Sequence, residues 1–140
     1  MLTDIREGVG KMPIYTYQAM DQKGILCYGY DATGLQAMAR DIGGVVGCEV
    51  NVIDATGHEH DAIRDILEGC PPSESAPIGT KFLMFLGFDD YEIRDAMASI
   101  SIEPRPIFCC LTQNNYTWGL SHLAKHLEAE REEMSRGDRT

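Results

Sequence analysis

The stretch Tyr28-Gly29-Tyr30-Asp31 is matched 58 residues later by Leu86-Gly87-Phe88-Asp89. In both copies an apolar run leads to Gly, an aromatic residue and Asp, and apolar residues then follow at spacings i, i+3, i+4 and i+7. They are Leu35, Met38, Ala39 and Ile42 in the first copy and Ile93, Ala96, Met97 and Ile100 in the second. This spacing marks one face of an α-helix. The repeat therefore predicts two equivalent strand-and-helix units and assigns most patterned residues to the scaffold.

Each unit also contains a second strand and a second helix. Strands are expected at 25–28, 49–54, 82–86 and 107–111, where the runs are short and apolar. Helices are expected from Asp31 to about Ile42, up to about Leu67, from Asp89 to about Ile100 and from Trp118 to about Met134. Gly43-Gly44 is expected to stop the first helix. Asp89 and Glu92 predict a capping box for the third.

The order β-α-β-α occurs twice, which predicts an α/β fold. Two tandem β-α-β-α repeats should form a mainly four-stranded sheet with helices packed on its faces. Strands joined by a helix within one unit should be parallel. How the two units meet stays open: they can continue one parallel sheet, or meet across a pseudo-two-fold axis with the two central strands antiparallel.

The predicted division of the chain follows from the repeat. Residues 25–134 form a single α/β domain, with repeat units at 25–68 and 81–134 and a proline-containing linker at 69–80. Residues 1–24 form an N-terminal arm or edge strand, with some strand character at 13–20. Residues 135–140 form a tail.

Charge and composition exclude several classes of partner. The chain has a net charge of −10, and its acidic residues are spread through the sequence. Binding to a nucleic-acid backbone requires Lys and Arg to displace counterions, so neither nucleic acid nor an anionic membrane surface is expected as a partner. No apolar run approaches the roughly 18 to 20 residues that span a bilayer, and residues 1–11 lack the apolar core of a signal peptide. A cytoplasmic location is expected.

The five cysteines form no CxxC pair. Cys27, Cys109 and Cys110 lie in the apolar runs, where they are expected to be reduced and buried. Cys48 and Cys70 lie in loop-like surroundings and are the expected exposed thiols. A thiol sensor that uses either of these two is one hypothesis for function.

Carboxylates follow several of the predicted strands. If the sheet is all parallel and the two Gly-aromatic-Asp strands are adjacent, Asp31, Asp89 and Asp90 would share one acidic cleft at the carboxyl ends of the strands. Such a cleft could hold Mg²⁺ through oxygen ligands, loosely like a phosphoacceptor receiver domain. The alternative is that Asp31 and Asp89 cap the helices that follow them.

A polar loop before the last helix is the best candidate for a binding surface. Its residues of interest are Thr112, Gln113, Asn114, Asn115, Tyr116 and Trp118. Amide and hydroxyl groups at a strand end and helix N-terminus can hold a small ligand or the backbone of a partner. An exposed tryptophan would mark an interaction surface. The alternative is an Asx-type turn that inserts Trp118 into the core.

The four histidines form two pairs. His122 and His126 have the i, i+4 spacing that lets two imidazoles share Zn²⁺, but the metalloprotease glutamate is missing. His58 and His60 flank Glu59. We expect all four to be solvated.

The residues from Phe82 to Trp118 also carry a resemblance. Met84-Phe85-Leu86-Gly87-Phe88 has a Gly-Phe step at its end, and Leu111-Thr112 ends a strand before the Asn-rich loop and Trp118. In these landmarks the chain resembles an uncharacterised bacterial family that is known only as a domain of unknown function. The resemblance covers about residues 25–134 and implies a fold but no activity.

This chain departs from that family inside the polar loop. Tyr116 and Thr117 stand where the family tends to have an Arg and an Asn. If the family's loop binds an anion through that Arg, this chain should not.

The sequence thus predicts no reaction and no catalytic residue. The favoured hypothesis is a non-catalytic small-molecule or protein-binding regulatory module without a cofactor. Its partner would be another protein or a second copy, bound through a sheet edge or the protruding last helix. The alternative is a metal-dependent or receiver-like enzyme that uses the acidic cleft.

Overall fold

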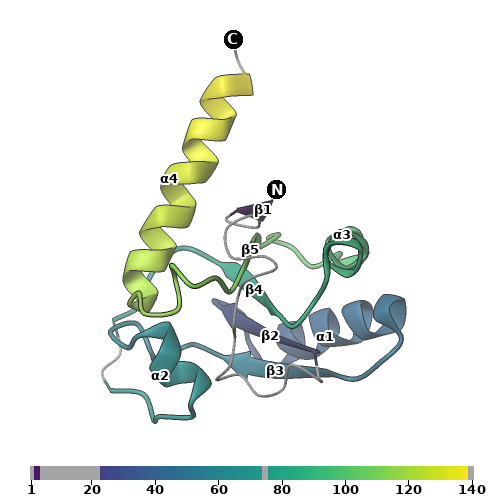
Figure 1. Ribbon diagram of the computed structural model, residues 1–140, viewed down its shortest axis with the longest axis horizontal. Helices are drawn as coiled ribbons and strands as arrows, with labels where there is room; N and C mark the ends of the chain where they lie inside the picture. The colour runs from purple at the N-terminus through teal and green to yellow at the C-terminus, as the bar shows by residue number, and fades with distance from the viewer. Residues whose placement is uncertain (1, 4–22, 74–75, 139–140) are drawn as a thin grey trace.

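The computed structural model describes residues 2–3, 23–73 and 76–138, and these form one mixed sheet with helices on both faces (Figure 1). The strands are β1 (Leu2–Thr3), β2 (Lys23–Tyr28), β3 (Val50–Asp54), β4 (Phe82–Leu86) and β5 (Ile107–Cys110). The helices are α1 (Ala32–Val46), α2 (Ile63–Leu67), α3 (Asp90–Ser99) and α4 (Leu120–Asp138). The predicted α/β class with alternating strands and helices is confirmed.

The two units meet across a pseudo-two-fold axis. The strand order is β1-β5-β4-β2-β3, with β2 parallel to β3, β4 parallel to β5, and β2 antiparallel to β4. Leu26 pairs with Met84, its counterpart 58 residues later, so the axis passes between them. A second crossing, the bridge between Ala62 and Gly119, joins residues 57 positions apart. The first unit is therefore β2-α1-β3-α2 and the second β4-α3-β5-α4.

The pairing of the units places α1 and α3 on one face of the sheet and α2 and α4 on the other (Figure 1). Alternate residues of β2, β4 and β5 point to opposite faces, as strand geometry requires. Leu26 and Met84 pack with α2 and α4, whereas Ile25 and Phe85 pack with α1 and α3. The spacing of Leu120, Leu123, Ala124 and Leu127 predicts the inner face of α4, and all four side chains are fully buried.

Both predicted aspartate caps are present. The Asp31 carboxylate accepts a hydrogen bond from the Gly34 N–H at 2.9 Å, and the Asp89 carboxylate accepts one from the Glu92 N–H at 2.8 Å. Glu92 in turn accepts from the Asp89 N–H at 3.0 Å, which completes the predicted capping box. The first unit lacks this box because Gly34 occupies the position equivalent to Glu92.

The predicted ends of two helices are wrong. Helix α1 runs through Gly43-Gly44 to Val46 and ends at Gly47, whose φ of 77° allows its N–H to bond back to the Gly43 carbonyl. A Cβ at Gly43 would lie 3.0 Å from the Cys48 carbonyl oxygen, so this glycine permits a close approach instead of a stop. Helix α4 begins at Leu120, not Trp118, and continues to Asp138, past its expected end near Met134.

The N-terminal arm is described only in part. Leu2–Thr3 pair in parallel with Phe108 and Cys109 as an edge strand, which adds a fifth strand to the predicted four. The strand character predicted at 13–20 lies outside the described residues.

Two lysines join the units reciprocally. Lys23 Nζ donates to the Gly87 carbonyl at 3.4 Å and lies 5.8 Å from the centre of the Phe88 ring. Its counterpart Lys81 donates to the Gly29 carbonyl at 3.0 Å and lies 5.6 Å from the centre of the Tyr30 ring. Each ammonium thus binds the end of the central strand in the other unit. Among the residues that the structure describes, the Lys23 site alone has an ion pair, in which Lys23 Nζ lies 3.1 Å from Glu92 Oε1.

The repeat predicts that Gly34→Glu stabilises the protein. The new side chain would copy Glu92 by capping the Asp31 N–H and pairing with Lys81. Replacing a helical glycine contributes about 1 kcal/mol and the new polar contacts a few tenths more, offset in part because the new Cβ lies 3.0 Å from Ile102 Cδ1. Urea unfolding should show a net gain of about 1 kcal/mol.

Gly34→Ala is the matched control, since it adds helix propensity and meets the same Ile102 contact without a carboxylate. If Gly34→Glu is no more stable than Gly34→Ala, the two helix starts are not equivalent in their electrostatics.

Candidate functional site

The polar loop before α4 is fixed by hydrogen bonds within itself. Thr112 and Asn115 are buried, and each uses its side chain to bind the backbone N–H of the other, at 2.9 and 3.1 Å. Asn115 Nδ2 also donates to the Cys110 carbonyl at 3.1 Å. These two side chains, proposed as ligand contacts, therefore have structural roles in closing the loop.

The remaining loop side chains form the accessible part of the candidate site. Gln113 and Asn114 are exposed, whereas Tyr116 and Trp118 are half-buried. The Trp118 ring stands edge-on to the His122 ring, with centres 4.6 Å apart, and to the His126 ring, with centres 5.0 Å apart. We call Gln113, Asn114, Trp118 and His122 the loop surface. This surface comprises the amide groups of Gln113 and Asn114 and the Trp118 ring, which packs on two histidine rings.

Of the histidine pair on α4, His122 is exposed, as predicted, whereas His126 is half-buried. His126 Nε2 lies 3.1 Å from Glu130 Oε2, and its ring packs on Trp118. No cluster of three or more His, Cys, Asp or Glu side chains suited to a metal ion occurs within residues 2–3, 23–73 and 76–138.

Backbone bonds fasten this loop to the corresponding loop of the first unit. The Ile63 N–H donates to the Trp118 carbonyl, and the Leu120 N–H donates to the Asp61 carbonyl, both at 2.9 Å. Two further backbone hydrogen bonds join the same loops. The Arg64 N–H donates to the Tyr116 carbonyl at 2.9 Å, and the Ser121 N–H donates to the Glu59 carbonyl at 3.3 Å. The candidate loop is therefore positioned by both units.

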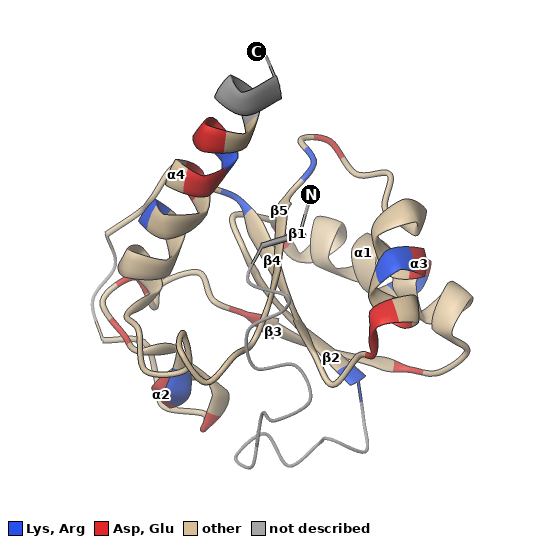
Figure 2. Cartoon of the chain, turned by 45° about the horizontal axis from the view of Figure 1, so that its top comes forward, with Lys and Arg blue, Asp and Glu red and all other residues tan. Residues whose placement is uncertain are grey.

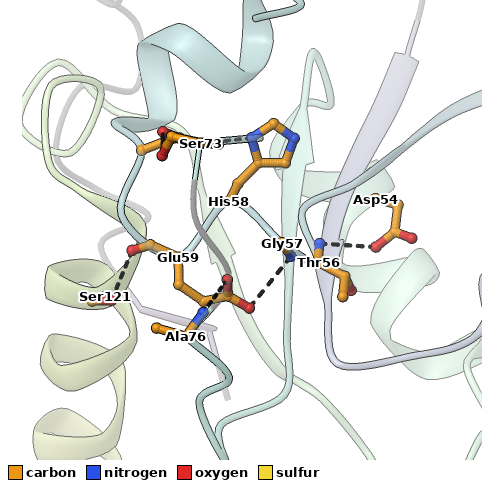
Figure 3. Close-up of polar contacts among 9 residues, drawn as sticks. Asp54, Thr56, Gly57, His58, Glu59, Ser73, Ala76 and Ser121 are labelled. Atoms are coloured by element: carbon orange, nitrogen blue, oxygen red, sulfur yellow. Dashed lines mark hydrogen bonds and ion pairs between the residues drawn. The ribbon is translucent and has the colours of Figure 1, made fainter. Parts of the chain in front are cut away.

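The first unit holds its own loop through a buried carboxylate, that of Glu59, which is 1% exposed (Figure 3). Glu59 Oε2 accepts from the Tyr28 hydroxyl at 2.5 Å and from the Gly57 N–H at 3.3 Å, and Oε1 accepts from the Ala76 N–H at 3.0 Å. The Tyr28 hydroxyl accepts from the Ile78 N–H at 3.0 Å. Together these bonds attach the linker to β2.

Hydrogen bonding outweighs burial at Glu59. Burial is the largest single effect and disfavours the charged form, but the bonds from Tyr28 and from the N–H groups of Ala76, Glu59 itself and Gly57 together lower the pKa of Glu59 to about 2. The pKa of the Tyr28 hydroxyl is raised by burial and by its bond to Glu59. The pair is a structural anchor in which Glu59 stays ionised.

His58 is buried at 8% exposure and not solvated, which corrects the prediction for this residue. Its Nδ1 lies 2.9 Å from Asp61 Oδ2, and Ser73 Oγ donates to Asp61 Oδ1 at 2.6 Å. The bond from Ser73, followed by that from His58, lowers the pKa of Asp61. Because Asp61 stands between Ser73 and His58, the hydroxyl donates to the carboxylate and not to the imidazole, and the three do not form a hydrolase triad.

The acidic cleft predicted for Asp31, Asp89 and Asp90 required two parallel neighbouring strands, and that condition is not met. Since β2 and β4 are antiparallel, Asp31 and Asp89 follow opposite ends of the sheet. Asp31 and Asp89 cap their own helices, and Asp90 is an exposed residue in the first turn of α3. The structure does not bring the three carboxylates together.

The cysteines lie as expected. Cys27, Cys109 and Cys110 are buried, Cys48 and Cys70 are exposed, and all five are free thiols. Burial, followed by the charge of Asp54, raises the pKa of the Cys27 thiol well above its ordinary value, so this group is unsuited to thiolate chemistry.

The charged residues are spread over the structure, as the even distribution of acidic residues in the sequence predicts. Acidic residues are spread over the helices and loops, with Lys and Arg scattered among them (Figure 2). None of the helices in the described part of the chain is long and apolar enough to cross a membrane.

Comparison with known families finds a match over the second unit. Residues 81–134 match a domain of unknown function (DUF3783), which spans β4, α3, β5 and most of α4. This confirms the resemblance over the second unit as one to a domain without an assigned activity. No curated protein and no solved structure matches the chain.

Acid titration should reveal the Glu59 anchor. The pKa of Glu59 in the folded protein lies near 2, below its ordinary value of 4.5, so its contribution to stability is complete above pH 4.5 and is lost as pH falls toward 2. With screening by solvent near the linker, the loss should be on the order of 1 to 2 kcal/mol. Urea unfolding at a series of pH values measures it.

Glu59→Gln is the control because it keeps the shape of the side chain and removes the titration. The difference in stability between native protein and variant should shrink as pH falls through this window. A difference that stays constant with pH would show that the charge of Glu59 does not contribute.

Proposed function

We propose that this chain is a non-catalytic binding module whose contact site is the loop surface beside α4. The observation that carries the proposal is the division of roles within the loop. Thr112 and Asn115 use their side chains to close the loop, whereas Gln113 and Asn114 are exposed on the same loop as Trp118. A preorganised loop binds with a smaller entropy cost than a mobile one.

The chemistry of the loop surface favours a small polar molecule or an extended peptide. Exposed amides can both donate and accept hydrogen bonds, and a half-buried aromatic ring supplies apolar contact area. Tyr116 stands where the resembling family tends to have Arg, so a neutral ligand suits this site better than an anion.

The wider setting of the proposal is a reduced, cytoplasmic, bacterial protein. Five free thiols fit a reducing compartment. The net charge of −10 opposes nucleic acid and anionic lipid as partners. A homodimer through the protruding end of α4 is part of the same proposal.

Truncation of the tryptophan tests the site. Trp118→Ala should weaken binding at least tenfold, because aromatic anchors dominate interface energetics. The assay screens metabolites and short peptides by the fluorescence of Trp118, the only tryptophan, and then measures hits by calorimetry in native protein and variant.

Trp118→Phe keeps the ring packing on His122 and His126, and Tyr91→Ala removes an exposed aromatic of α3 as a distant control. Equal affinity of a ligand for native protein and for Trp118→Ala would show that the binding site does not include Trp118.

The competing enzyme hypothesis is tested with metal. Titration with Mg²⁺ or Mn²⁺ should give no saturable change in Trp118 fluorescence or in melting temperature. Asp89→Asn should behave as the native protein does, since asparagine also caps helices, whereas Asp89→Ala should lose about 1 kcal/mol. A saturable response that Asp89→Asn abolishes would support the metal-dependent enzyme hypothesis instead.

A further inference from the structure

The second unit cannot bury its apolar surface alone. In this chain the inner edge of β4 is covered by β2, and the apolar faces of α3 and α4 share their two cores with the first unit. Two strands and two helices on opposite faces do not close a core by themselves. Yet the domain match covers this unit only. The unit therefore needs a partner of complementary shape, which the first unit supplies here.

The hydrogen bonds across the axis indicate which kind of partner the second unit can accept. The four bonds between the loops run from the N–H groups of Ile63, Arg64, Leu120 and Ser121 to carbonyl oxygens, so they involve only backbone atoms. The pairing of β2 with β4 is likewise a backbone ladder. None of these bonds depends on the side chains that distinguish the first unit from the second.

The charged contacts favour pairing of the second unit with another copy of itself over pairing with the first unit. Lys23 of the first unit pairs with Glu92 of the second, but the position equivalent to Glu92 in the first unit is Gly34, which offers Lys81 no carboxylate. Lys81 and Glu92 belong to the same unit. Two second units related by this axis would therefore make the ion pair twice, whereas the present arrangement makes it once.

We propose that residues 81–134 carry a self-complementary surface, and that its partner is the same unit of a second copy of this chain. In that pairing Met84 lies opposite Met84 on the axis, and Lys81 of each copy reaches the Gly87 carbonyl, the Phe88 ring and Glu92 of the other. Phe82 lies opposite Leu86, so every central contact is apolar. In the intact chain the first unit occupies this surface, and pairing between copies follows its displacement.

Displacing the first unit within the full chain tests the proposal. Ile25→Asp with Leu26→Asp puts a carboxylate into each core, where both native side chains are fully buried, so β2 can no longer pair. Sedimentation equilibrium should give about twice the chain mass of 15.5 kDa, with helical circular dichroism and a melting temperature that rises with concentration. A monomer without cooperative melting overturns the proposal.

Charge reversal checks the register of the dimer. Added to the displaced variant, Lys81→Glu or Glu92→Lys should each raise the dissociation constant about tenfold, because like charges then meet at two sites, and the two together should restore it. The same changes in the native chain are the control. There Lys81 contacts Gly29 and Glu92 contacts Lys23, so the double change should not compensate. Association that ignores these charges overturns the proposal.

Discussion

The antiparallel pairing of β2 with β4 determines the rest of the structure. It sets Leu26 opposite Met84 and relates the two units by a pseudo-two-fold axis. Because each unit carries one long amphipathic helix behind its central strand, the axis brings α1 and α3 onto the same face, where they pack over one core. The same axis brings α2 and α4 onto the other face. It also directs the carboxyl ends of the two central strands to opposite edges of the sheet, which separates Asp31 from Asp89.

Within this frame the two units use different means to hold the loops that meet at the axis. The first uses a charge: Glu59 is buried, stays ionised through its hydrogen bonds, and attaches the linker at Ala76 to the hydroxyl of Tyr28. The second uses an amide, since Asn115 is fully buried and closes its own loop without help from the other unit. The exposed loop amides Gln113 and Asn114 and the tryptophan Trp118 belong to the second unit, and for this reason the candidate site lies there.

Local patterns in the sequence predict local structure well. The apolar spacing predicts the inner faces of α1, α3 and α4, and Asp89 with Glu92 predicts its capping box, because both depend on residues within one or two turns. The direction of one unit against the other depends on pairing between distant strands, so it could not be deduced. Gly43 misleads because it lies in the last turn of α1, where its missing Cβ leaves room for the Cys48 carbonyl oxygen, and the sequence does not show this close approach of the backbone. Glu59 gives no signal, since a buried carboxylate in a polar loop looks like an exposed one. Lys23 and Lys81 also lie 58 residues apart, in frame with the repeat, so the sequence itself predicts that they occupy equivalent positions.

The fold depends on two equivalent units that meet in antiparallel fashion, and nuclear magnetic resonance tests this arrangement most directly. Backbone assignments followed by nuclear Overhauser measurements across β2 and β4 report the partner of each strand residue. The structure requires cross-strand contacts between Ile25 and Phe85 and between Leu26 and Met84, together with a contact between Ala62 and Gly119. A parallel pattern between β2 and β4, or the absence of these contacts in the folded protein, would contradict the two-fold arrangement on which both proposals depend.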